Sequence, residues 1–286
     1  MSPGRLGAWF LACRPKTLSV SLAPVLVGTA LAWQQQAYLL WLPLLAAALG
    51  AALIQIGTNL FNDVGDFLRG TDQPGRIGPP RATAEGWLTP AAVKAGAWVS
   101  FALAFACGIY LVGHGGWPIV AIGLCSLAAG WAYTGGPKPI AYGPLGELFV
   151  IAFFGVVAVG GSYYLQTLAL SPAAALAGLQ LGLLAAAVIT VNNYRDLDSD
   201  AASGKRTLAV RLGRPATRWL YAGELLAPYL LLLGGTVWPL LSLPLALWLI
   251  HRFWRETPGP GFNGLLAATA GLQLAFALLL TLSLTI

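Results

Sequence analysis

Long apolar segments alternate with short polar connections along the whole of this 286-residue chain. A helix needs about 20 apolar residues to cross the hydrocarbon core of a bilayer. Only helices fit, because backbone polar groups in lipid must be satisfied within the segment. The pattern therefore predicts an all-α polytopic membrane protein, with one bundle of about nine transmembrane helices forming a single domain over 1–286. The nine spans are predicted at residues 17–33, 40–62, 90–112, 117–134, 145–167, 173–194, 216–233, 236–250 and 264–284.

Composition supports this interpretation. Hydrophobic residues make up 57% of the chain and charged residues only 9%, whereas a soluble domain is roughly half apolar and about 25% charged. Most of the surface must therefore face something other than water, and the lipid bilayer is the expected partner. Gly- and Ala-rich faces serve packing within a bundle as well as between chains, so the sequence predicts no oligomeric state.

The basic residues indicate the orientation of the bundle. The connections at 34–38, 113–117, 168–172 and 234–238 contain no Lys or Arg, and the connections on the other side carry nearly all of them. Because basic loops stay in the cytoplasm, the N-terminus is predicted to be cytoplasmic and the C-terminus outside, in a bacterial cytoplasmic (inner) membrane. The net charge of +6 is then an orientation signal, and no nucleic-acid partner is expected.

Two polar stretches interrupt this pattern, "NLFNDVGDFLRGTDQPGRIGPPR" at 59–81 and "VNNYRDLDSDAASGKR" at 191–206, and they hold all six aspartates. In the first stretch, polar residues recur at a spacing that shares one helix face, at Asn59, Asn62, Asp63 and Asp66. The second stretch repeats this spacing at Asn192, Asp196 and Asp200. Both stretches follow predicted spans on the cytoplasmic side, so we expect them to face each other across one cavity that opens to the cytoplasm.

The side chains in these stretches favour a metal and a phosphorylated substrate. Carboxylate and amide oxygens from two helices make the hard, oxygen-only site that Mg²⁺ prefers, often bridging to substrate phosphates. Arginine and lysine near such a site bind the oxygens of a diphosphate, and the cations near this one are Arg76, Arg81, Lys138, Lys205 and Arg206. An apolar tail could enter between the helices from the lipid, which suggests a prenyl diphosphate.

The two stretches resemble the aspartate-rich motifs of the UbiA superfamily of intramembrane aromatic prenyltransferases, from "RPKTL" at 14–18 to about residue 215. Three further segments resemble the branch that acts on 1,4-dihydroxy-2-naphthoate in menaquinone synthesis. These are "PGRIGPPR" at 74–81, "AYTGGPKPIAYGPLGE" at 132–147 and "GKRTLAVRLG" at 204–213.

The resemblance implies a role for each candidate residue. The Mg²⁺ ligands would be Asn62, Asp63, Asp66, Asp72, Asn192, Asp196 and Asp200. The substrate-binding residues would be Asn59, Arg76, Arg81, Lys205 and Arg206. The catalytic residues would be Asp66, Asp196, Lys138 and Tyr133, with Tyr133 orienting the acceptor or shielding a cation.

The implied reaction transfers a polyprenyl group from polyprenyl diphosphate to 1,4-dihydroxy-2-naphthoate. Carbon dioxide and diphosphate are lost, and demethylmenaquinol is formed. A carboxylate that must leave is best held by at most one arginine, for which we expect Arg81. Two alternatives stay open on the sequence. One is a sister prenyltransferase acting on 4-hydroxybenzoate, homogentisate or haem, and the other is a cation-coupled transporter, whose sites usually lie nearer the membrane midplane.

Overall fold

A computed structural model describes residues 3–72, 76–232 and 234–286 of the chain. The described residues form helices joined by loops, without a strand, which confirms the predicted all-α class. The helices are α1 Arg5–Cys13, α2 Ser19–Gln36, α3 Trp41–Leu68, α4 Pro90–Gly115, α5 Trp117–Ala132, α6 Gly146–Ile151, α7 Ala158–Thr167, α8 Pro172–Arg195, α9 Leu197–Ala202, α10 Leu208–Leu230, α11 Leu243–Arg255 and α12 Gly261–Thr285. Pro74 and Gly75, which begin the "PGRIGPPR" segment, and Leu233, at the end of the seventh predicted span, lie outside the described residues.

Helices cover all nine predicted spans within the described residues. The fifth span is built from α6, a π-helical stretch over Ala152–Val157, and α7, and the eighth joins a 3₁₀ turn over Trp238–Ser242 to α11. By length and composition alone, five described helices could cross a membrane, or six if α1 and α2, bent by 47°, count as one span. The number of nine crossings stays a prediction.

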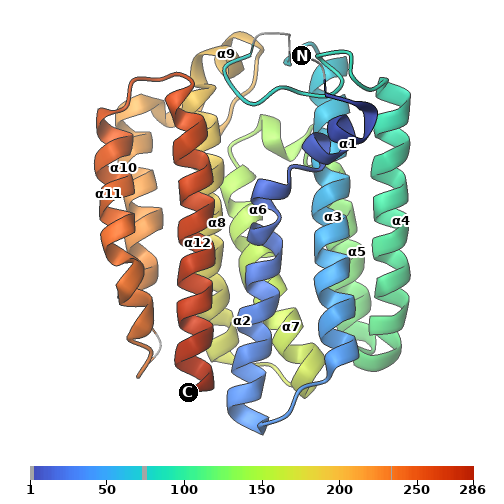
Figure 1. The fold of residues 1–286 in the computed structure, drawn as a ribbon, viewed down its shortest axis with the longest axis vertical. Helices are drawn as coiled ribbons and strands as arrows, with labels where there is room; N and C mark the ends of the chain where they lie inside the picture. The colour runs from blue at the N-terminus through green and yellow to red at the C-terminus, as the bar shows by residue number, and fades with distance from the viewer. Residues whose placement is uncertain (1–2, 73–75, 233) are drawn as a thin grey trace.

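The two chain ends lie at opposite ends of an upright bundle, the N-terminus at the end where α9 lies and the C-terminus at the far end of α12 (Figure 1). This placement is what an odd number of crossings requires. The helix α3 packs on α4, α2 packs on α7 and α12, and α8 packs on α10, α12 and the π-helical stretch. The largest buried apolar cluster fills the space among α2, α7, α8, α10, α11 and α12.

The helix α8 is the most enclosed of the five helices that could each cross a membrane, and local signals define its start. Ser171 caps it by accepting a hydrogen bond from the Ala174 backbone N–H at 3.3 Å, and Pro172 occupies its first turn, where a missing N–H costs nothing. Of its most apolar window, 72% is buried inside the protein. The position of the second acidic stretch, which begins at the end of α8, is therefore fixed by the core.

Glycines let α8 approach the π-helical stretch closely. A methyl group on Gly182 would lie 2.6 Å from the Ile151 carbonyl oxygen, and one on Gly178 would lie 2.6 Å from the Val156 Cα. Small residues at such crossings allow backbone-to-backbone packing, which is how helices associate in lipid. These glycines set the distance between α8 and the wall of the bundle that contains Phe149 and Phe153.

Replacing Gly182 by alanine is expected to destabilise the protein by about 1–3 kcal/mol, because the added methyl overpacks a backbone contact. Gly223→Ala on α10 is the matched control, since a methyl there meets nothing within 4 Å and alanine favours the helix by up to about 1 kcal/mol. Thermal unfolding of the two purified variants in detergent tests this. Equal melting temperatures would show that the α8 crossing is not tight.

Candidate active site

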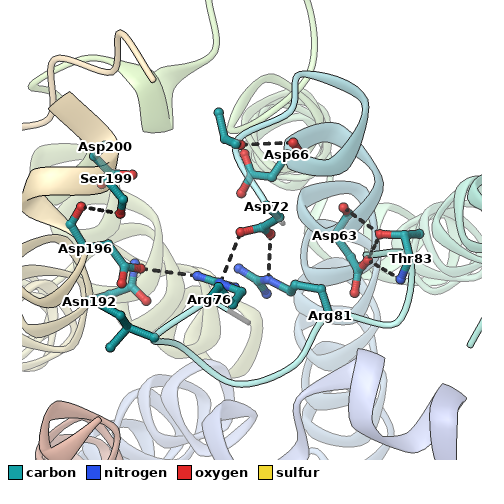
Figure 2. Close-up of polar contacts among 12 residues, drawn as sticks. Asp63, Asp66, Asp72, Arg76, Arg81, Thr83, Asn192, Asp196, Ser199 and Asp200 are labelled. Carbon is teal, nitrogen blue, oxygen red and sulfur yellow. Dashed lines mark hydrogen bonds and ion pairs between the residues drawn. The ribbon is translucent and has the colours of Figure 1, made fainter. Parts of the chain in front are cut away.

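The two acidic stretches meet at one end of the bundle, beside α9 and the loop after α3 (Figures 1 and 2). The first stretch comes from the end of α3 and the loop that follows, and the second from the end of α8 and from α9. The prediction that they face each other is therefore confirmed in the described residues. Two cations make the contacts between them.

The first link is made by Arg76. Its Nε lies 3.2 Å from an Asp72 oxygen, and its Nη2 lies 3.2 Å from Asp196 Oδ2 on the other stretch. Figure 2 shows this guanidinium between the two carboxylates. Arg81 binds the second oxygen of Asp72 through its Nε at 2.9 Å, so two arginines share one buried carboxylate.

The second link is made by Lys205. Its Nζ lies 3.7 Å from Asp66 Oδ1 and 3.3 Å from Asp200 Oδ1. Tyr142 donates a hydrogen bond to the same Asp66 oxygen at 2.8 Å, and Lys205 also lies 4.8 Å from the centre of the Tyr142 ring. We call Asp66, Asp72, Asp196 and Asp200, with the cations that bind them, the carboxylate cluster.

Two residues of the predicted polar face of α3, Asp63 and Asn59, bind the backbone of neighbouring segments. The carboxylate of Asp63 accepts hydrogen bonds from the backbone N–H groups of Ala82 and Thr83, at 3.0 and 3.1 Å, and from the Thr83 hydroxyl. It therefore anchors the loop after α3, and the structure does not bring it into the carboxylate cluster (Figure 2). Asn59 donates its amide to the Cys13 carbonyl at 3.1 Å and so holds the turn after α1.

The predicted single helix face from Asn192 to Asp200 is interrupted. The helix α8 ends at Arg195, Asp196 has φ −93° and ψ 7°, and α9 begins at Leu197. The turn still brings Asp196 and Asp200 close together, because the Asp200 N–H donates to the Asp196 carbonyl at 2.8 Å. Asp198, which the spacing leaves off this face, is exposed and pairs with Arg214 at 2.7 Å.

Sequence reasoning did not select two residues that hold this end of α8. Arg195 binds both oxygens of Asp196, at 2.8 and 2.6 Å, and Asn192 Oδ1 at 2.9 Å. Asn263 on α12 accepts from Arg195 at 2.8 Å and donates to the Ile77 carbonyl at 3.1 Å. The position of Arg195 directly before Asp196 was a usable signal, but Asn263 lies in an apolar helix far along the chain and gave none.

The remaining predicted residues are spread more widely. Tyr133 and Asn62 are half-buried and line the cavity beneath the site. Lys138 and Arg206 are exposed, and neither is among the described residues that line this cavity. Arg206 contributes its backbone N–H, which donates to the Tyr142 carbonyl at 2.8 Å, so the structure ties the loop after α9 to the loop after α5 through its main chain.

A cavity of about 890 Å³ extends from this end of the bundle between the helices. Its polar end includes Arg14, Asn62, Arg76 and Asn192, and its walls come from α1 to α8, the π-helical stretch and α12. The apolar lining continues to Leu111 near the end of α4, at the opposite end of the bundle. The volume lies at the upper end of the range for ligand pockets, and a long apolar chain suits its shape.

The donors of the carboxylate cluster are oxygens, as Mg²⁺ requires. Among the described residues no three acidic, histidine or cysteine side chains converge as a set of metal ligands, because Arg76 and Lys205 lie between the carboxylates. These cations would have to turn away for a metal to bind, and the oxygens of a diphosphate would give them new partners. The cluster therefore fits Mg²⁺ together with a diphosphate.

Burial changes the proton affinity of the cluster. It raises the pKa of Asp72 to about 6, although Arg76 acts in the opposite direction. It also raises the pKa of Asp200 to about 6, against the lowering effect of Lys205. Burial acts to lower the pKa of Lys205, but Asp66 and Asp200 outweigh it, so this pKa is raised and the ammonium stays charged.

Comparison with known proteins gives matches over most of the chain. The model of the UbiA prenyltransferase family matches residues 21–262. The 1,4-dihydroxy-2-naphthoate octaprenyltransferase of Mycobacterium tuberculosis is 40% identical over 245 residues, which cover 84% of this chain and 83% of that protein. The protein of the same name in Escherichia coli is 41% identical over 224 residues, covering 76% of this chain and 72% of its own.

Solved structures share the fold at much lower identity. A UbiA homolog from Archaeoglobus fulgidus bound to DMAPP and Mg²⁺ has a TM-score of 0.60 at 14% identity, covering 96% of this chain and 98% of that one. The apo structure of a UbiA homolog from Aeropyrum pernix has a TM-score of 0.65 at 17% identity, covering 94% and 97%. At this identity the likeness establishes the bundle architecture alone.

We expect Mg²⁺ to bind this site more weakly as the pH falls below 6. Asp72 and Asp200 are then protonated, and a metal ion must displace those protons. With both pKa values near 6, the affinity should fall about tenfold per protonated ligand between pH 7 and pH 5. Calorimetric titration of Mg²⁺ in the presence of pyrophosphate measures this. Asp200→Asn should make the pH dependence shallower, and a constant affinity from pH 7 to 5 would contradict the assignment.

Proposed function

The chain belongs to the UbiA prenyltransferase family, and we propose that it is a Mg²⁺-dependent 1,4-dihydroxy-2-naphthoate polyprenyltransferase. It transfers a polyprenyl group from polyprenyl diphosphate with loss of CO₂ and diphosphate, giving demethylmenaquinol. Family membership confirms the resemblance noted in the sequence. The names of the bacterial relatives support the acceptor. The observation that carries the proposal is a cluster of carboxylates and cations at the head of a long apolar cavity.

Mg²⁺ would be held by the four aspartates of the cluster, with Asn62 and Asn192 beside them. When bound, it neutralises the charge that develops on the departing diphosphate. Arg76 and Lys205 would exchange their carboxylate partners for phosphate oxygens, which they bind as charge-assisted donors. When Arg76 turns to the phosphate, Asp72 stays paired with Arg81. Asp196 likewise stays paired with Arg195, so neither carboxylate is left without a cation.

The prenyl chain and the aromatic acceptor would react within the apolar cavity. As the C–O bond to the diphosphate breaks, the allylic carbon becomes positively charged. Tyr133, Phe149 and Phe153 line the cavity, and their ring faces can stabilise this cation. The electron-rich ring carbon that bears the carboxylate then forms the new C–C bond, and the carboxylate leaves as CO₂ while its electron pair restores the aromatic ring.

The membrane setting follows from the same geometry. We assign the end that carries the carboxylate cluster to the cytoplasm of a bacterial inner membrane, because the basic residues gather there and basic loops stay inside. The C-terminus then lies outside. A water-soluble diphosphate reaches the site from the cytoplasm while its tail stays in the apolar cavity, and one domain over 1–286 provides both environments.

The reaction is tested with purified protein, Mg²⁺, a polyprenyl diphosphate and 1,4-dihydroxy-2-naphthoate carrying a labelled carboxylate. We expect the wild-type protein to release labelled CO₂. Asp66→Ala and Asp196→Ala should each lower the rate by on the order of 10²-fold or more, since charge stabilisation in a buried site is lost. Asp198→Ala is the matched control and should change the rate less than about twofold, because Asp198 is exposed and its ion-pair partner among the described residues is Arg214.

The outcomes separate the possible activities. Prenylation of another phenol without CO₂ release would move the protein to a sister branch with the same site. Turnover that needs no Mg²⁺ and releases no pyrophosphate would contradict the proposal altogether.

Gly78 is expected to be essential for the geometry of this loop. A methyl group there would lie 2.7 Å from Arg195 Nη2 and 2.9 Å from Arg76 Nη2, so Gly78→Ala must displace one of these guanidinium groups. We expect the rate to fall about tenfold or more, as small displacements of positioning groups produce, with little change in melting temperature. Gly143→Ala is the control, because its methyl meets the Ile140 carbonyl at an ordinary 3.6 Å. Equal rates for both variants would rule out this role.

A further inference from the structure

The helices α10 and α11 form one side of the bundle (Figure 1) and do not line the cavity within the described residues. Positive charge is concentrated where α10 begins and α11 ends, and every cation there is an arginine, since the chain has no lysine after Lys205. Arginine suits phosphate groups, because its planar guanidinium binds two oxygens at once. We call these arginines, together with Trp219 and Trp254, the basic edge; they are Arg211, Arg214, Arg218, Arg252 and Arg255.

Arg218 and Arg255 have donors that the protein does not use. Arg255 is exposed, and its side chain makes no hydrogen bond or ion pair with the described residues. Arg218 donates through its Nε to the hydroxyl of the buried Tyr194 at 3.0 Å, while its two Nη groups make no hydrogen bond in the described part of the chain. Arg214 and Arg252 differ, because each is already paired with a carboxylate. The basic edge therefore offers one anchored and one exposed guanidinium to an outside anion.

A pair of tryptophans brings these two arginines to the same level of the bundle. The rings of Trp219 on α10 and Trp254 on α11 meet edge to face, with centres 4.7 Å apart. Trp219 directly follows Arg218, and Trp254 directly precedes Arg255. Trp219 is 68% exposed and Trp254 37%, as is typical of tryptophans at the level of the lipid headgroups. The exposed Leu247, seven residues before Trp254 and so on the same face of α11, continues this surface towards the membrane interior.

We propose that the basic edge binds an anionic phospholipid, whose phosphate lies between Arg218 and Arg255 and whose acyl chains lie along α10 and α11. Basic pockets between helices on the cytoplasmic side of a membrane suit such headgroups. The arginines match the negative charge of the lipid, and the exposed tryptophans and Leu247 match its glycerol and acyl parts. A free phosphate would use the arginines alone. The site is separate from the prenyl-transfer cavity, so it binds lipid whatever the acceptor of the reaction is.

The basic edge also contacts the segment that carries the second acidic stretch. Arg214 donates through its Nη1 to the Tyr194 carbonyl at 3.2 Å, and its Nη2 pairs with Asp198 on α9 at 2.7 Å. Tyr194 directly precedes Arg195, whose guanidinium binds Asp196. A headgroup bound beside Tyr194 would therefore support the end of α8 from the side that faces away from the cavity.

Native mass spectrometry of the full-length protein in detergent, with added dioleoylphosphatidylglycerol or dioleoylphosphatidylcholine, tests the proposal. We expect the wild-type protein to bind the anionic phosphatidylglycerol about tenfold more tightly than the zwitterionic phosphatidylcholine. Arg255→Gln should weaken phosphatidylglycerol binding about fivefold, the contribution of one arginine beside an anionic lipid, and Arg218→Gln/Arg255→Gln about 25-fold. Both variants should bind phosphatidylcholine within about twofold of the wild type. Because Arg255 is exposed and unpaired among the described residues, its single variant keeps the test decisive if the double variant does not fold.

Arg5→Gln/Lys94→Gln is the matched control, because it removes the same charge from two exposed residues away from the basic edge. Lys94 lies on α4, at the opposite side of the bundle (Figure 1). This variant should change both affinities less than about twofold, because neither residue belongs to the site. Equal losses for the two double variants would show unspecific attraction and overturn the proposal, as would equal binding of both lipids by the wild type. Displacement of phosphatidylglycerol by an equal concentration of inorganic phosphate would assign the edge to a free anion and overturn it too.

Discussion

The ion pair that joins Arg76 to both Asp72 and Asp196 holds the two halves of the site together. These carboxylates come from segments more than 120 residues apart, and burying either alone would be expensive. The cluster contains four carboxylates and four cations, Arg76, Arg81, Arg195 and Lys205, so it carries no net charge. A cluster without net charge can be buried at the end of an apolar bundle. Four aspartates without these cations could not, because each unpaired carboxylate would carry a large desolvation cost.

Contacts elsewhere in the fold hold the residues of the carboxylate cluster in position. Glycine contacts set α8 against the π-helical stretch, and Asn263 on α12 joins Arg195 to the loop at Ile77. The helices α10 and α11 do not line the cavity in the described residues; they enclose the other side of α8. Core packing around α8 therefore limits how far the second acidic stretch can move when its ion pairs change.

The sequence predicted the helical class, the nine segments and the meeting of the acidic stretches, because hydrophobic runs and clustered aspartates are local features. The sequence did not predict which aspartates bind the cations of the cluster and which bind backbone groups. Asp63 and Asp66 lie three residues apart on α3, yet Asp63 anchors the loop at Thr83 and Asp66 binds Lys205. That difference depends on where a loop 20 residues away returns to the helix. The buried Nη2 of Arg14, which makes no hydrogen bond among the described residues, was equally hidden, because a missing partner is visible only in three dimensions.

The ion pairs within the carboxylate cluster also explain how the site can be stable without substrate and still bind Mg²⁺ and a diphosphate. Arg76 and Lys205 each bind two carboxylates, one from each stretch, and so act as internal counterions. A diphosphate that enters with Mg²⁺ brings charges of both signs, so carboxylates can turn to the metal and cations to the phosphate without leaving a charge unpaired. Asp72 and Asp196 each keep a second arginine during this exchange. Exchange of partners within a neutral cluster avoids the desolvation cost of exposing or creating a lone buried charge.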